Sequence, residues 1–138
     1  MTPIFLDTSY LIALLRRKDA LHERAKAWRR QMSGRLITTE YVLVEFLDAM
    51  SSIRLRAVAL ATANALDDAA SVEIVPASPG LLQEAKAIYA HADKKWGLTD
   101  CASFCVMRAR RLTDALTADR HFEQAGFHAL LRNDAATQ

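Results

Sequence analysis

The chain has 138 residues, of which 51% are hydrophobic and 25% are charged, and its formal net charge is +2. This is enough apolar material for one domain with its own core, so folding does not depend on disulfides or a structural metal. The weakly basic charge permits a polyanionic partner, but it is too small for a protein that binds DNA mainly by electrostatics.

Short apolar runs alternate with longer amphipathic segments from the N-terminus onward. The apolar runs predict strands at residues 4–6, 36–38, 72–75, 115–117 and 127–131. The amphipathic segments predict helices at residues 10–17, 20–32, 40–50, 55–67, 81–94 and 100–110, and a short one from Asp119 to Gly126. Because such alternation is typical of a parallel sheet covered on both faces, we expect one α/β domain over residues 1–138. This domain would be a three-layer α/β/α sandwich with a frayed tail at 133–138.

Capping residues mark several of the expected helix ends. Asp7-Thr8-Ser9, Thr39 and Thr99 precede helices, and Ser33-Gly34 and Gly126 follow them. Ser, Thr and Asp side chains accept hydrogen bonds from free backbone N–H groups at a helix start, and Gly adopts the left-handed conformation at a helix end. These residues support the predicted alternation of strands and helices.

Two further features indicate a cytoplasmic protein. Cys101 and Cys105 lie four residues apart in an apolar helical stretch, where we expect two buried thiols without a disulfide. No run reaches the ~20 apolar residues of a membrane span, and Met1 leads into the first apolar run without a basic leader.

Three aspartates lie where a parallel sheet binds its ligands. Asp7 and Asp119 follow predicted strands, and Asp100 opens a predicted helix. Ligands of open parallel sheets bind at the carboxyl ends of the strands. Taken singly, however, each aspartate is explained more simply as a helix N-cap that complements the helix dipole.

Glu45 interrupts an apolar run in the middle of a predicted helix. At about 100° per residue, it lies at the border of the apolar stripe that contains Val42, Phe46 and Ala49. A carboxylate at this border is suited to a cleft, although a solvated helix face explains it equally well.

Convergence of these four acids would have a chemical consequence. Carboxylates ~5 Å apart repel by a few kcal/mol per pair at an effective dielectric near 20, so such a cluster needs cations or must take up protons. Oxygen ligands suit Mg²⁺ or Mn²⁺, and no His or Cys lies beside the acids at zinc-like spacing. A pair of such ions activates water and stabilises the leaving oxygen of a phosphodiester. Spacing alone does not establish this convergence.

Four sequence blocks together resemble the PIN-domain nucleases, and within them the VapC-type toxins of type II toxin–antitoxin pairs. The blocks cover residues 4–9, 39–45, 98–104 and 115–122, and Gly126-Phe127 follows the last of them. Each block alone is weak, but all four occur in order over nearly the whole chain. The resemblance implies a PIN-like α/β/α sandwich that gathers the four acids in one pocket.

The resemblance also implies an activity and its partners. It indicates a ribonuclease that depends on Mg²⁺ or Mn²⁺ and hydrolyses phosphodiester bonds in RNA. It further implies a homodimer, silenced by a cognate antitoxin that occupies the groove beside the active site.

Residue by residue, the resemblance assigns all four acids to catalysis. Asp7, Asp100 and Asp119 match the chief metal ligands. Glu45 matches the acid that completes the cluster and helps to orient the attacking water. Two hydroxyl residues match positions that support the pocket by hydrogen bonds: Thr117 and Ser9.

One departure concerns the end of the helix at 100–110. Related sequences often have Gly there, whereas residues 108–112 contain none. A residue other than Gly must then adopt or avoid a left-handed cap, at modest strain.

Other candidate residues have simpler explanations. His121 lies near the proposed pocket, and we expect it to be structural or supporting rather than a ligand. Tyr10, Trp96 and Phe122 fit core packing better than base stacking. Among the basic residues, Arg120 is best placed by sequence to pair with an RNA phosphate.

Alternatives remain open at this point. One is a PIN nuclease that processes RNA or DNA without an antitoxin, and an antitoxin gene immediately upstream would separate it from the toxin. Another is a PIN module that binds RNA or protein without cutting, although retention of all four acids argues against it. A haloacid-dehalogenase phosphatase is excluded because Ser9 stands where it needs a second Asp.

Overall fold

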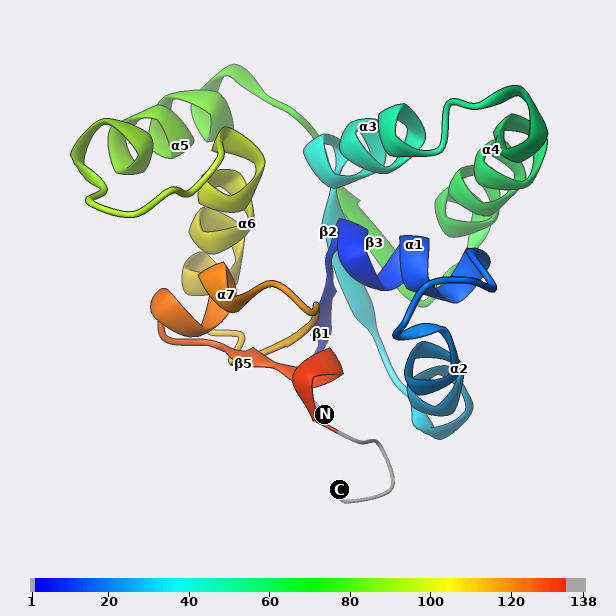
Figure 1. Cartoon of the computed structure of the whole chain (residues 1–138). Helices are drawn as coiled ribbons and strands as arrows, with labels where there is room; N and C mark the ends of the chain where they lie inside the picture. Colours follow the sequence, from blue (N-terminus) through cyan, green and yellow to red (C-terminus); the bar gives the residue numbers. More distant parts are fainter. Residues whose placement is uncertain (1, 134–138) are drawn as a thin grey trace.

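Five parallel strands form the centre of the computed structural model (Figure 1). In spatial order β3-β2-β1-β4-β5, they follow the chain as β1 Ile4–Leu6, β2 Leu36–Thr39, β3 Val72–Val75, β4 Asp114–Leu116 and β5 His128–Ala129. The structure describes residues 2–133. Of the predicted tail, Asn133 is described and accepts a hydrogen bond from the Trp28 indole, 3.2 Å away; residues 134–138 lie outside the described residues.

Helices cover both faces of this sheet, which confirms the predicted α/β/α sandwich. They are α1 Thr8–Leu15, α2 His22–Gln31, α3 Glu40–Ala49, α4 Ile53–Asp68, α5 Pro79–His91, α6 Leu98–Ala109 and α7 Arg120–Gln124, with a 3₁₀ turn at Leu130–Arg132. Figure 1 shows α1, α2 and α4 on one side and α5, α6 and α7 on the other. Helix α3 contacts α1, α4 and α6. No helix within residues 2–133 combines the length and apolarity needed to cross a bilayer.

The strand order creates a switch point between β1 and β4. The connections from β1 to β2 and from β2 to β3 step one way across the sheet, and the chain then returns to β4 on the other side of β1. Neighbouring strands whose connections leave in opposite directions form a crevice at their carboxyl ends, where open α/β sheets bind ligands. This crevice therefore lies where residues 7–9 and 117–119 leave the sheet.

The central strand is buried on both faces. Phe5 in β1 pairs with Ile37 of β2 on one side and with Ala115 of β4 on the other, and all three side chains are buried. An uninterrupted apolar strand is what a covered parallel sheet requires.

An aromatic cluster joins the sheet to α6 and α7. The Phe104 ring lies 5.0 Å from both the Trp96 and Phe122 rings in edge-to-face contact, and 5.7 Å from Phe127. Phe122 also meets Phe5 of β1 at 6.2 Å. Trp96 and Phe122 are thus parts of the packing, as predicted.

The remaining predictions about packing are also confirmed. Tyr10 is buried in the core cluster. Cys101 and Cys105 are free, buried thiols.

The helix starts differ from the predicted ones by at most two residues, and α3 begins where it was predicted. The starts of α5 and α6 are the ones at which a predicted break or cap was wrong. Helix α6 begins at Leu98 with Gly97 as N-cap, so Thr99 is not the cap. Asp100 therefore lies in the first turn, where its carboxylate accepts a hydrogen bond from the Gly97 N–H (3.3 Å). Helix α5 begins at Pro79 and is capped by the Ser78 hydroxyl, because proline is favoured in a first helical turn, where its missing N–H is not needed.

The last predicted strand is shorter than expected. Only residues 128–129 pair with β4, and the apolar residues that follow form the 3₁₀ turn. Leu130 and Leu131 are buried in this turn. Apolar residues suit a buried turn as well as a buried strand, so the apolar run alone did not distinguish a turn from a strand.

The end of α6 contains the expected left-handed residue. Arg111 has a φ of 56°, and its N–H donates to the Arg108 carbonyl while the Leu112 N–H donates to the Met107 carbonyl (2.8 Å). This pairing is the usual helix-ending motif with Gly at the left-handed position. Arg111 adopts this left-handed conformation although its Cβ then lies too close to the following carbonyl oxygen.

Arg111→Gly is expected to raise the free energy of unfolding by about 1 kcal/mol, because Gly removes the left-handed strain and loses part of this gain through its larger unfolded-state entropy. Urea unfolding of both proteins measures the difference. Arg111→Ala removes the same side chain and keeps the Cβ, so a gain of equal size in the Ala variant would contradict the explanation.

Candidate functional site

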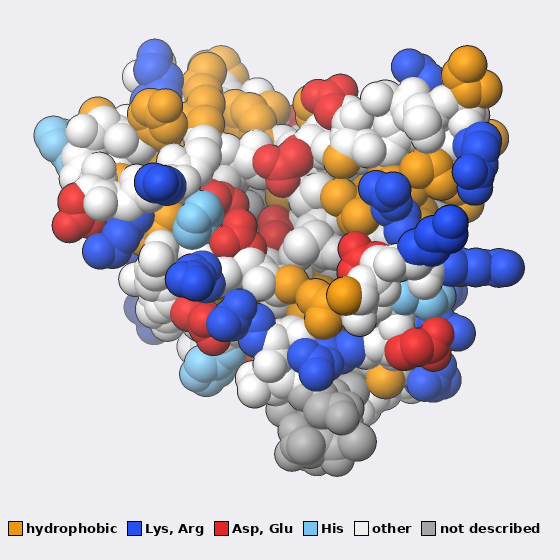
Figure 2. Space-filling model, viewed as in Figure 1, with side chains coloured by type: hydrophobic (Ala, Val, Ile, Leu, Met, Phe, Trp, Pro, Cys, Tyr) orange, Lys and Arg blue, Asp and Glu red, His pale blue; other side chains and the backbone are white. Residues whose placement is uncertain are grey.

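Four acids from separate segments lie around the carboxyl ends of β1 and β4. Asp7 follows β1 directly, Asp119 comes three residues after β4, Asp100 lies in the first turn of α6, and Glu45 lies in the middle of α3. Figure 2 shows acidic side chains gathered in a hollow on this face, with Lys and Arg side chains on both sides.

Asp7 is held by two hydroxyl groups. The Thr117 hydroxyl donates to its Oδ2 at 2.7 Å, and the Ser9 hydroxyl donates to the same oxygen at 3.2 Å. Asp7 occupies the N-cap position of α1, but its side chain makes no capping hydrogen bond. Helix capping therefore does not account for this aspartate.

The same hydroxyls join the two loops that leave the sheet. Thr117 Oγ1 accepts a hydrogen bond from the Asp119 N–H at 3.0 Å, and Ser9 Oγ accepts one from the Ala118 N–H at 2.9 Å. The supporting hydrogen bonds expected of Thr117 and Ser9 are thus present. They fix the backbone after β4 against the carboxylate after β1.

Burial and neighbouring charges both disfavour ionisation in this pocket. Asp7 is 4% exposed, and burial raises its pKa to about 7, with the charges of Asp100 and Glu45 adding to the rise and the Thr117 hydrogen bond opposing it. Burial also raises the pKa of Asp100, the charge of Asp119 adds to this, and its hydrogen bond to His121 opposes it. A nearby cation would oppose both effects and favour the ionised carboxylates.

Three side chains come close enough to share one ion. Asp100, Asp119 and His121 each offer a ligand atom within 4.8 Å of the other two. His121 Nδ1 lies 2.9 Å from Asp100 Oδ2 and 3.4 Å from Asp119 Oδ1. An octahedral ion with ligands at about 2.1 Å has neighbouring ligand atoms about 3 Å apart. The donor set therefore fits a divalent ion.

The other two predicted acids lie near this group. Asp7 and Glu45 are not members of the group formed by Asp100, Asp119 and His121. The charges of Asp100 and Glu45 nevertheless act on Asp7, where they raise its pKa. Glu45 is exposed on α3 and lines a surface pocket of about 420 Å³ together with Thr99. The role of Asp7 as a ligand stays a prediction.

His121 lies beside two of the predicted ligands, where the expected supporting role stays a prediction. Its ring nitrogen is 2.9 Å from Asp100 Oδ2 and 3.4 Å from Asp119 Oδ1. A local signal exists, because His121 follows Asp119 by two residues and its N–H donates to the Asp119 carboxylate at 2.9 Å. Its contact with Asp100 is set by the packing of α6 against α7.

The model of the PIN domain family matches residues 4–128. The chain belongs to the PIN domain family. Its fold is also similar to two solved structures. VapC20 of Mycobacterium tuberculosis, a toxin that cleaves the sarcin–ricin loop, is 27% identical with a TM-score of 0.85, over 92% of this chain and 98% of that one. FitAcB of Neisseria gonorrhoeae is 19% identical with a TM-score of 0.65, over 91% and 94%. No curated protein sequence matches the chain.

Proposed function

We propose that this PIN domain is a metal-dependent endoribonuclease that acts in the cytoplasm as the toxin of a toxin–antitoxin pair. The observation that carries the proposal is the buried carboxylate of Asp7, held by Thr117 next to the group of Asp100, Asp119 and His121. The similarity to VapC20, a toxin that cleaves an RNA loop, favours RNA as the substrate.

Asp7, Asp100 and Asp119 are the proposed ligands of Mg²⁺ or Mn²⁺. When bound, such an ion supplies an activated water and offsets negative charge on the phosphodiester. Thr117 and Ser9 keep Asp7 oriented by their hydrogen bonds. Glu45, exposed at the rim, orients the attacking water from the α3 side.

The charge distribution around the hollow suits an RNA strand. Lys and Arg side chains flank the acidic hollow on both sides (Figure 2), where they can pair with phosphates on either side of the cleaved bond. Arg120 is exposed at the start of α7, directly after Asp119. We assign Arg120 to a phosphate contact.

Asp100→Asn is expected to lower Mg²⁺-stimulated RNA cleavage at least ~100-fold, because loss of groups that only support a metal ligand already costs 10–100-fold. Cleavage of labelled RNA by the two purified proteins measures the loss. Asp114→Asn is the matched control, since Asp114 also contacts a histidine at 2.9 Å but lies at the start of β4, at the other end of that strand. Undiminished cleavage by Asp100→Asn would refute the assignment.

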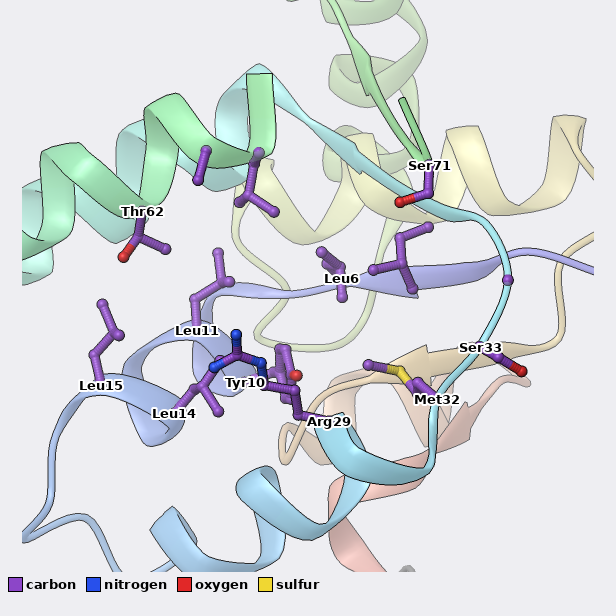
Figure 3. Close-up of a pocket in the computed structure, with 14 residues that line it drawn as sticks. Leu6, Tyr10, Leu11, Leu14, Leu15, Arg29, Met32, Ser33, Thr62 and Ser71 are labelled. Atoms are coloured by element: carbon purple, nitrogen blue, oxygen red, sulfur yellow. The ribbon is translucent and has the colours of Figure 1, made fainter. Parts of the chain in front are cut away.

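An apolar groove supports the antitoxin as partner. It has a volume of about 550 Å³ and lies between α1, α4 and the segment before β2. In Figure 3, Leu11, Leu14 and Leu15 of α1 face it from one side and Thr62 of α4 from the other. Arg29 of α2 also lines the groove. These features fit an amphipathic segment whose apolar side chains enter the groove and whose acidic side chains meet Arg29.

Coexpression with the protein encoded by the neighbouring gene tests this partnership. The two proteins are expected to copurify, and the complex is expected to lose RNA cleavage. A nuclease that cleaves equally well in the presence of that protein would instead be a PIN nuclease without an antitoxin.

We also propose that the protein is a homodimer. Large apolar side chains of α3 and α4 are exposed to solvent: Val44, Ile53, Val58 and Leu60. Helices α3 and α4 contact each other, and we assign the subunit contact to these two helices.

A further inference from the structure

The position of His121 suggests a role that the acids alone do not explain. Its Nδ1 lies 2.9 Å from Asp100 Oδ2 and 3.4 Å from Asp119 Oδ1. These carboxylates belong to different elements, one in the first turn of α6 and the other at the N-cap of α7. The ring nitrogen therefore lies where two separate carboxylates converge.

The ring is also anchored from its own backbone. The His121 N–H donates to Asp119 Oδ1 at 2.9 Å, and the next residue, Phe122, is fully buried in the aromatic cluster. The His121 side chain is 26% exposed, so part of the ring is open to solvent. A metal-ligating imidazole is held in a fixed orientation by its surroundings.

A simple ion pair does not describe this arrangement. His128 provides the comparison, because its Nδ1 also lies 2.9 Å from one carboxylate, that of Asp114, but its side chain is 73% exposed. His128 thus has one acid and open solvent around it, whereas His121 has two acids and partial burial. When the proton of the His121 ring is on Nε2, Nδ1 presents a lone pair at the point where the two carboxylates converge.

We propose that His121 is a direct ligand of the metal, which makes the centre a mixed nitrogen and oxygen site. This inference rests on the proposed metal-dependent function and specifies the ion. Mg²⁺ is bound mainly by oxygen, whereas first-row transition-metal ions accept imidazole readily. The site therefore prefers a transition-metal ion such as Mn²⁺ over Mg²⁺ more strongly than four carboxylates would.

Pulsed electron paramagnetic resonance of the Mn²⁺-loaded protein tests the ligand directly. The spectrum of the natural chain is expected to contain nitrogen modulation from a coordinated imidazole. His121→Asn replaces the nitrogen by an amide oxygen of similar reach, so this variant is expected to bind Mn²⁺ without the modulation. His128→Asn, the matched control, is expected to retain it.

Titration calorimetry with each ion gives a second, independent readout. The ratio of the Mg²⁺ to the Mn²⁺ dissociation constant is expected to fall about tenfold in His121→Asn and to stay unchanged in His128→Asn. Mn²⁺ binding with no nitrogen modulation in the natural chain would overturn the role of His121 and leave the proposed nuclease standing. Absence of Mn²⁺ binding at the acids would overturn both.

Discussion

Asp7→Asn is expected to abolish RNA cleavage and, at pH 8, to make the metal-free protein more stable. The carboxylate of Asp7 is buried, and its pKa is raised from 3.8 to about 7. Above pH 7 the metal-free fold therefore contains a buried charge that Asn lacks. Because one pKa unit corresponds to ~1.4 kcal/mol, we expect a gain of roughly 2–4 kcal/mol. The Asn carbonyl can still accept the hydrogen bond of Thr117.

The sign of the pH dependence follows from the direction of this shift. A carboxyl group whose pKa is higher in the folded state stabilises the fold fully below its unfolded value near 4, and this contribution is lost as the pH rises through about 7. The stability advantage of Asp7→Asn should thus be small at pH 4, grow as the pH rises from 4 to 7, and be largest at pH 8. Urea unfolding of both proteins at each pH, in the presence of a chelator, measures the difference in the free energy of unfolding. A large loss of stability in Asp7→Asn at pH 8 would mean that the ionised carboxylate stabilises the metal-free fold, which would contradict this explanation.

Phe104→Ala is expected to lower the free energy of unfolding by about 3–5 kcal/mol, the usual loss for a fully buried phenylalanine. The Phe104 ring is 0% exposed and contacts Trp96, Phe122 and Phe127. Its removal leaves a cavity between the two helices that carry Asp100 and His121. We therefore also expect weaker Mn²⁺ binding.

Thermal unfolding and Mn²⁺ titration measure the two effects. Phe104→Leu is the conservative control, since it keeps most of the apolar volume and should lose far less stability. A loss below about 1 kcal/mol in the Ala variant would mean that the neighbouring rings refill the space.

The sequence predicted the layers of this fold because its signals are local. Each strand is a short apolar run, and such runs become buried in a parallel sheet whatever their exact ends. The helix starts at Pro79 and Leu98 were missed for a physical reason. Proline and glycine were interpreted as breaks, whereas Pro79 fits a first helical turn and Gly97 fits an N-cap.

The acids of the site were predictable in position, but their individual contacts were not. Asp7 and Asp119 follow strands, which places them at the carboxyl edge of any parallel sheet. Asp100 and His121 are 21 residues apart, and their contact of 2.9 Å depends on how α6 packs against α7. The spacing of apolar residues does not predict how these two helices pack against each other.

The hydroxyl of Thr117 has one hydrogen, which it gives to Asp7, and it accepts the N–H of Asp119. Its orientation is therefore fixed without any help from a cation, and the two loops that it joins behave as one rigid unit. It follows that this part of the centre is preorganised. Loading an ion should leave the backbone of residues 7–9 and 117–119 where it already lies.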